Sequence, residues 1–244
     1  RTYNRRFPRI ATMLAKPLID LDAALLDCCR NAVVITASER ARDALLHAYD
    51  AHQEGAGLRT WKRAQVVTLA AYLRQRYCEL LRASHGGGIL LGAHAQRLAW
   101  LDHVPRPVDA DFDGIYDQIA QAWQLAHDWE LIGDLSQFSD NENQRLFRSW
   151  ALRYRRAAQR DRWVTEAELP ALVSQALNDR SLSADACLFF GFDVVPPSLM
   201  HLIEVMNRSE AIASIHPLAS GPAVEVLGAR CEDPVHERQA AILW

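Results

Sequence analysis

Two short β-branched segments in the first third of the chain each run directly into a helical pattern, and this order constrains the possible fold more than any other feature. The first segment is residues 31–36, NAVVIT, and the helical pattern after it places Ala41, Leu45 and Ala48 on one face. The second is residues 64–68, AQVVT, which continue into a longer helix with apolar residues again at helical spacing. Strands that alternate with crossover helices are typical of parallel sheets. The sequence therefore predicts an α/β fold built on a parallel sheet.

The pattern changes after these two units. From about residue 89 to 181, apolar residues recur at helical spacing and no convincing strand is apparent. Strand-like segments then return at residues 186–192, 211–215 and 223–227. The last residues, DPVHERQAAILW, have the pattern of a helix cut off at Trp244, which indicates a fragment of a longer protein.

One α/β core that carries an all-helical insertion accounts for this order most simply. The predicted parts are an unplaced N-terminal segment at residues 1–30, the core at residues 31–83 plus 183–244, and the insertion at residues 84–182.

Composition excludes several classes of protein. Half of the residues are hydrophobic and 23% are charged, which favours a packed core over disorder. The apolar runs are far shorter than the ~20 residues that span a bilayer, so no membrane segment is expected. The net charge is −3, so any contact with nucleic acid requires a local basic patch.

The five cysteines show no CxxC pair and no zinc-ligand spacing. This pattern argues against a disulfide framework and a structural zinc, and it favours a reducing compartment, by default the cytoplasm. Cys78 and Cys187 lie in apolar segments, which predicts that both are buried.

The connection after the first strand lacks the residues of a phosphate-binding loop. Such a loop needs glycines, whose backbone N–H groups surround the phosphates, and a lysine that neutralises them. Residues 36–42 read TASERAR instead, and Thr36 with Glu39 has the pattern of a capping box. Glu39 would also place a negative charge where a phosphate should lie. We therefore predict no productive ATP binding at Thr36, Ser38 and Glu39.

The strand at residues 188–190 ends in a similar way without catalytic groups. A strand end that holds Mg²⁺ in an ATPase offers adjacent carboxylates, but this one offers Phe190 and Gly191. Asp193 follows, ahead of two prolines that open a helical pattern, and it is most simply an acceptor at the helix N-terminus. The sequence predicts no metal site, no cofactor and no catalytic residue.

A predicted amphipathic helix at residues 140–162 carries the strongest candidate site. Its apolar side is formed by Phe147, Trp150, Ala151, Tyr154 and Ala158. Seven arginines fall on the other half of the helix: Arg145, Arg148, Arg153, Arg155, Arg156, Arg160 and Arg162.

The chemistry of this arginine-rich half favours phosphate. The planar guanidinium donates two parallel hydrogen bonds to a phosphate, and a single late acid, Asp161, lies among the seven arginines. The pattern therefore predicts contact with DNA or RNA. The alternative is a solvated face, or one paired with the acids Asp109, Asp111 and Asp113.

Ordered segments of the chain resemble a known family. They are VVITASERARDALLHAYD, GLRTWKRAQVVTLAAYLRQRY, RLFRSWALRYRRAAQRDRWVTEAELPALVSQAL, LFFGFDVVPPSLMHLI and the final HERQAAILW. Together they are similar to the N-terminal part of bacterial "probable DNA repair" proteins, which are related to the B subunit of AddAB-type helicase–nucleases.

This resemblance implies an inactivated superfamily 1 helicase fold. The expected architecture is a RecA-like core of the P-loop NTPase type, with a helical subdomain inserted between its first and second motor motifs. These motifs would fall on residues 36–43 and 190–194, and neither position holds the residues that ATP hydrolysis requires. A nuclease of the PD-(D/E)XK type would follow beyond Trp244.

The expected function is a non-catalytic helicase-like module of a DNA double-strand-break repair protein. It would contribute DNA contact or scaffolding for the nuclease and would act with a helicase–nuclease partner subunit. Three alternatives remain open: a protein-interaction scaffold without DNA affinity, an ATP-binding motor with degenerate motifs, and a small-molecule enzyme whose site is assembled from distant residues.

Overall fold

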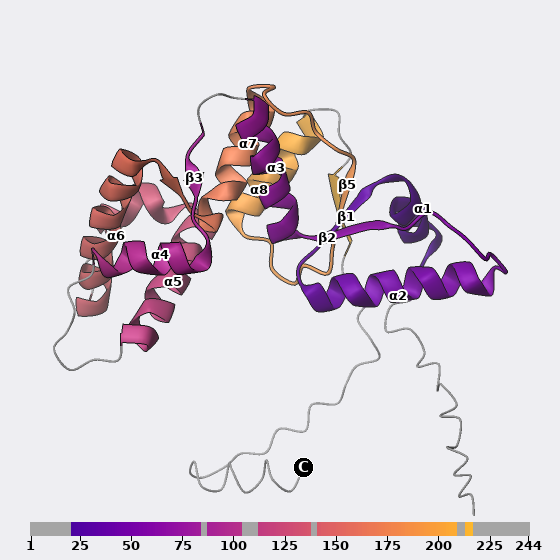
Figure 1. Cartoon of the computed structure of the whole chain (residues 1–244), viewed down its shortest axis with the longest axis horizontal. Helices are drawn as coiled ribbons and strands as arrows, with labels where there is room; N and C mark the ends of the chain where they lie inside the picture. Colours follow the sequence, from indigo (N-terminus) through magenta and orange to yellow (C-terminus); the bar gives the residue numbers. More distant parts are fainter. Residues whose placement is uncertain (1–20, 84–86, 104–111, 138–140, 209–212, 217–244) are drawn as a thin grey trace, which may run out of the picture.

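The computed structural model describes residues 21–83, 87–103, 112–137, 141–208 and 213–216, and it shows a mixed α/β protein (Figure 1). The helices are α1 (Ala23–Asn31), α2 (Glu39–Gly55), α3 (Leu69–Ala83), α4 (Ala93–Leu101), α5 (Phe112–Asp128), α6 (Glu142–Asp161), α7 (Leu169–Asn178) and α8 (Pro197–Arg208). Short 3₁₀ segments are η1 (Leu131–Gln137) and η2 (Glu166–Glu168). The strands are β1 (Val33–Thr36), β2 (Gln65–Thr68), β3 (Ile89–Leu90), β4 (Trp163–Val164), β5 (Cys187–Phe190) and β6 (Ala213–His216). Within these ranges, no helix is both long and apolar enough to cross a membrane.

The main sheet has four parallel strands in the order β2-β1-β5-β6. Thr36, the last residue of β1, is in register with Thr68 of β2 and with Phe190 of β5. The prediction of an α/β fold with a parallel sheet is confirmed. Because β2 and β5 lie on opposite sides of β1, the chain changes direction across the sheet at the carboxyl ends of β1 and β5. In open α/β sheets, such a switch point is where ligands commonly bind.

Alternate residues of the strands face different helices, as the two-residue period of a strand requires. Val34 and Leu188 belong to the apolar cluster beneath α1 and α2. Ile35 and Phe189, the next residue in each strand, belong to the cluster formed with α3, α7 and α8. The sheet is therefore covered on both faces, which explains why its strands are almost continuously apolar.

The helical segment between β2 and β5 divides between two cores. Val173 and Leu177 of α7 pack in the cluster that α3 and α8 form on the sheet. A separate cluster, centred on Trp100, Trp123 and Tyr154, joins α4, α5 and α6. The α/β part of the molecule thus includes α7, although α7 falls within residues 84–182.

A short parallel ribbon pairs β3, the strand before α4, with β4, the strand after α6. Ile89 and Leu90 of β3 are in register with Trp163 and Val164 of β4. The sequence predicted no strand between residues 89 and 181, and this prediction is wrong because β3 and β4 lie in that range. Strands of two residues are too short to produce an alternating pattern, and this pairing joins segments far apart in the sequence.

The described cysteines are free, but burial differs among them. Cys187 is buried in β5, as predicted, whereas the predicted burial of Cys78 is wrong because its side chain is exposed. Tyr77, its neighbour in α3, turns into the core instead. Only part of the surface of α3 packs against the core, and Cys78 lies on the part that does not.

Candidate nucleic-acid interface

Local sequence signals set both ends of α6, the helix that carries the predicted arginine face. Asn141 is the N-cap, and its side-chain oxygen accepts a hydrogen bond of 2.9 Å from the backbone N–H of Gln144. At the other end, Arg162 adopts a left-handed conformation, with φ of 57°, and terminates the helix. The predicted helix is confirmed over Glu142–Asp161.

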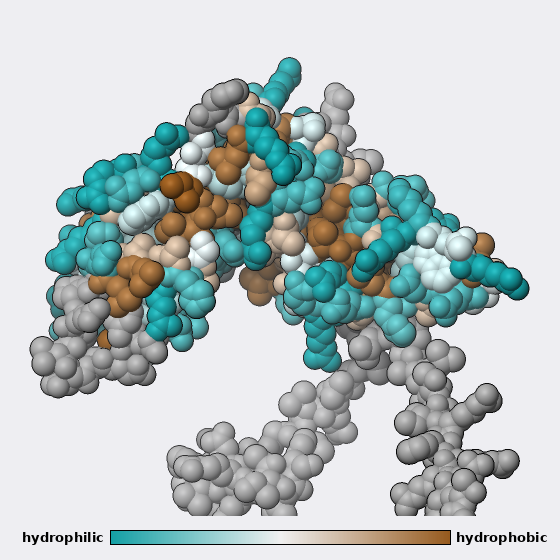
Figure 2. Space-filling view, viewed as in Figure 1, coloured by the Kyte–Doolittle hydropathy of each residue, from teal (hydrophilic) through white to brown (hydrophobic). Residues whose placement is uncertain are grey.

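The apolar side of α6 is anchored as predicted. Ala151, Tyr154 and Ala158 are buried, and the Tyr154 ring stacks on Trp100 with a centroid separation of 3.9 Å. Trp123 meets the Tyr154 ring edge-on at 5.4 Å. This aromatic packing fixes the rotation of α6 about its axis, so the opposite side of the helix is turned outward. Hydrophilic residues cover that outer surface at the left of the molecule (Figure 2).

Three of the predicted arginines form an open basic surface. Arg145, Arg153 and Arg156 are exposed and, among the described residues, have no hydrogen-bond or ion-pair partner. Together with Arg148, Ser149 and Leu152, they line a shallow hollow of about 370 Å³, which we call the arginine hollow. No carboxylate lines this hollow. The side chains present can therefore donate hydrogen bonds and positive charge, but they offer no acid–base pair.

Two further arginines, at one flank of α6, bond to the adjacent segment η1. Arg148 donates to the backbone oxygen of Ser136 at 3.0 Å, and Arg155 donates to that of Ile132 at 3.3 Å. Both side chains are partly buried. These hydrogen bonds hold η1 against α6, and they occupy part of the donor groups of both arginines.

The last two predicted arginines, Arg160 and Arg162, do not line the arginine hollow. Arg160 forms two hydrogen bonds to Asp161, at 2.8 and 2.7 Å, and this contact lowers the pKa of the Asp161 carboxyl. Arg162 lies beyond the end of α6, and its guanidinium donates to the backbone oxygen of Gly87 at 3.2 Å. The prediction of seven arginines on one helical face is wrong for Arg162, because the helix ends before it. Of the proposed acidic partners, Asp109, Asp111 and the side chain of Asp113 lie outside the described residues.

The predicted degenerate nucleotide positions at the end of β1 serve local structure. Ser38 is the N-cap of α2, and its side chain accepts from the backbone N–H of Ala41 at 3.2 Å. Thr36 is not the cap, because strand pairing continues through it and its buried hydroxyl donates to the oxygens of Ser38 and Val67. Glu39 forms an ion pair with Arg42.

The corresponding positions after β5 come together without forming a metal site. Phe190 is buried, and its backbone oxygen accepts from the N–H of Ala37 at 3.4 Å, which joins the two strand ends. Gly191 follows with φ of 74°, a conformation that favours glycine. Asp193 is exposed and makes no hydrogen bond to α8 in the described structure, so its predicted role as a helix cap is wrong. The described residues include no group of three or more His, Cys, Asp or Glu placed to hold a metal.

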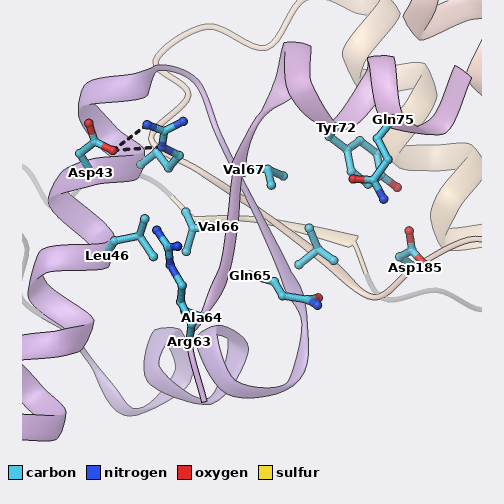
Figure 3. A pocket seen from close by; sticks show the side chains of 12 residues that line it. Asp43, Leu46, Arg63, Ala64, Gln65, Val66, Val67, Tyr72, Gln75 and Asp185 are labelled. Atoms are coloured by element: carbon cyan, nitrogen blue, oxygen red, sulfur yellow. Dashed lines mark hydrogen bonds and ion pairs between the residues drawn. The ribbon is translucent and has the colours of Figure 1, made fainter. Parts of the chain in front are cut away.

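A second hollow, which sequence patterns did not indicate, follows the outer edge of β2 (Figure 3). It measures about 550 Å³ and lies between α2 and α3, with the Arg42–Asp43 ion pair on one wall and Tyr72 on the other. Its charged lining residues are of both signs: Arg42, Arg63, Asp43 and Asp185. The sequence could not reveal it, because only the strand order makes β2 an edge strand.

Comparison of the chain with protein-family models and with curated proteins found no match.

Proposed function

We propose that this chain is a non-catalytic, helicase-like module of a DNA double-strand-break repair protein, and that it contacts the DNA phosphates through the arginine hollow. The observation that carries the proposal is the group of three exposed arginines, Arg145, Arg153 and Arg156, in a hollow without a carboxylate. An unpaired guanidinium keeps its full hydrogen-bonding capacity for a phosphate, and that is the contact that arginine makes best.

The spacing of the three arginines suits an extended polyanion better than a single phosphate. At 1.5 Å of rise per residue, Arg145 and Arg156 are separated by about 16 Å along the helix axis, and Arg153 lies between them. At 100° per residue, the three project within about one quarter of the helix circumference. A nucleic-acid backbone that follows α6 would therefore meet all three side chains.

The helicase-like assignment rests on the resemblance of the ordered segments and on the alternation of α/β, helical and α/β regions. Three features of the β1–α2 connection support a non-catalytic role: it has no glycine or lysine, Ser38 caps the helix, and Glu39 pairs with Arg42. By the same resemblance, the module would act beside a nuclease and a partner subunit. The cysteine pattern favours the cytoplasm as the compartment.

The test is fluorescence anisotropy of a labelled forked DNA titrated with the protein over a series of salt concentrations. We expect binding that weakens steeply with salt, because phosphate contacts release counterions. The variant Arg145→Gln/Arg153→Gln/Arg156→Gln should bind more weakly, and its slope of log K against log salt should be shallower by roughly 2 to 3, for three lost contacts.

A second triple variant provides the matched control. Arg40→Gln/Arg59→Gln/Arg82→Gln removes the same charge from exposed arginines on other segments. Equal weakening by both triple variants would show that only net charge matters and would contradict the assignment to α6. Absence of DNA binding at low salt, with binding of an acidic peptide, would favour the scaffold alternative. Binding of Mg·ATP in calorimetry would favour the degenerate motor.

A further inference from the structure

A serine lies in the middle of the arginine hollow. Ser149 lines it together with Arg145 and Arg153, which come four residues before and four residues after it in α6. Residues four apart are neighbours on one side of a helix, and each step of four covers about 6 Å along the axis. The Ser149 hydroxyl therefore lies between two arginines, one turn away in each direction.

This hydroxyl is free to meet a ligand. A serine inside a helix often donates to the backbone oxygen four residues earlier, and Ser174 of α7 does so, at 2.8 Å from the oxygen of Pro170. Ser149 is half-buried, but in the described structure its hydroxyl makes no such bond to Arg145 and has no other partner. Oγ of Ser198 is unpartnered and shielded from solvent, but Oγ of Ser149 is not shielded in this way. Its donor is thus available at the surface of the hollow.

The other side chains of the hollow determine which ligand this donor can meet. They are Arg145, Arg148, Leu152, Arg153 and Arg156, without a carboxylate, a side-chain amide or an aromatic ring. Arginine donates hydrogen bonds and accepts none, so the hollow is poor in acceptors for the donor edge of a base, and it has no ring on which a base could stack. A phosphate accepts hydrogen bonds through its oxygens and carries negative charge, so it suits the hydroxyl and the guanidiniums together.

We propose that Ser149 donates a hydrogen bond to one phosphate group of the nucleic-acid backbone, and that Arg145 and Arg153 hold this phosphate from either side. The inference rests on the proposed function, because it requires DNA to be bound at the arginine hollow. It adds one uncharged contact to the charged contacts of the arginines.

An uncharged contact differs from an arginine contact in its response to salt. The slope of log K against log salt depends on the number of phosphates that charged groups neutralise, so the loss of an arginine contact makes it shallower. A hydroxyl neutralises no charge. Its loss should lower K by the same factor at every salt concentration and leave the slope unchanged.

The test is the titration of labelled forked DNA over the salt series with Ser149→Ala. We expect the affinity to fall by about tenfold at every salt concentration, as for a lost hydrogen bond to a charged group. Ser181→Ala is the matched control, because it removes an exposed hydroxyl from the loop between α7 and β5, and it should bind like the unaltered protein.

A combined variant tests whether the serine and the arginines hold the same phosphate. When Ser149→Ala is added to Arg145→Gln/Arg153→Gln/Arg156→Gln, it should weaken binding by less than about twofold, because contacts to one shared group are not additive. Alanine favours a helix more than serine does, so the protein should stay folded, and circular dichroism during thermal unfolding checks this.

The outcomes separate this inference from the proposed function. Absence of DNA binding, or binding that is insensitive to the three arginine changes, overturns both. Binding that depends on the arginines but is the same in Ser149→Ala, or is weakened equally by Ser181→Ala, overturns only the contact of Ser149. A shallower salt slope in Ser149→Ala, or an undiminished effect of this change in the combined variant, also overturns that contact.

Discussion

At the scale of single residues, the burial of His127 changes the pH at which its side chain binds a proton. Burial holds the pKa of its imidazole at about 4, against an ordinary value of 6.5, and the Arg155 guanidinium adds to the shift. Glu130, Asp179 and His201 line the same hollow of about 490 Å³ as His127. The folded state thus keeps the imidazole neutral over a range in which the unfolded chain binds a proton.

The stability of the protein should therefore fall on acidification through this range. Because the folded-state pKa is depressed, the unfolded state binds more protons between about pH 6.5 and pH 4, and the free energy of unfolding decreases as the pH falls. We expect His127 to account for a loss of up to about 3 kcal/mol. Urea unfolding at pH 7.5, 6, 5 and 4.5 should show a shallower pH dependence for His127→Gln than for the unaltered protein. His52→Gln, at an exposed position of α2, should retain the original slope, and parallel curves for all three would refute the assignment.

At the scale of elements, the β3–β4 ribbon depends on close contact between two chain segments. Gly88 precedes β3, and its backbone oxygen accepts a hydrogen bond of 2.7 Å from the Tyr77 hydroxyl. A Cβ at this position would lie 2.6 Å from Cγ2 of Val164 and 2.8 Å from the backbone oxygen of Arg162. The second of these neighbours is backbone and cannot rotate away. A glycine is therefore required here for packing.

Gly88→Ala should separate the two strands of the ribbon and destabilise the protein by about 2 kcal/mol, the usual cost of forcing a methyl group into a packed site. Denaturant unfolding measures this change directly. Gly133→Ala in η1 is the matched control, because its Cβ would meet no atom within 4 Å. Equal stability of the two variants would show that β3 and β4 are not held closely together.

Helix α6 shows that an element can be predicted from the sequence while the roles of its individual residues cannot. The period of its apolar residues was enough to place Tyr154 and Ala158 inward and the arginines outward. The division of those arginines depends on η1, which lies earlier in the chain and supplies backbone acceptors to Arg148 and Arg155. Helical periodicity gives direction around one axis, but it carries no information about the neighbouring segment.

At the scale of the whole molecule, a buried arginine joins the two parts of the α/β region that the helical segment separates in sequence. Arg76 of α3 is 5% exposed, and its guanidinium contacts Glu79 at 2.6 Å and Asp185 at 3.1 Å. It also donates to the backbone oxygen of Ser183. Asp185 and Ser183 belong to the segment that enters β5, so these contacts link α3 to the start of that strand.

Arg76→Ala should lower the free energy of unfolding by roughly 2–3 kcal/mol, because it removes charge-assisted hydrogen bonds from a buried site. The loss stays below the cost of a fully buried pair, since Asp185 is 40% exposed and can be hydrated. Arg74→Ala, on the same helix, removes an exposed pair with Glu166 and should cost less than about 1 kcal/mol. Denaturant unfolding of both variants tests the difference, and an equal effect would rule out a structural role for the Arg76 contacts.

The sequence by itself determined the parallel α/β class, the β1–α2 and β2–α3 units, and the apolar side of α6, because these follow from periodicities of two and 3.6 residues within short segments. It could not determine that Ser38 rather than Thr36 caps α2, since that depends on how far strand pairing continues. Nor could it reveal the β3–β4 ribbon, the position of α7 on the sheet, or the burial of Oγ of Ser198 and Nε2 of His127 without a hydrogen-bond partner in the described structure. Each of these arises from contacts between segments far apart in the chain, and only the tertiary structure decides which polar groups find partners there and which do not.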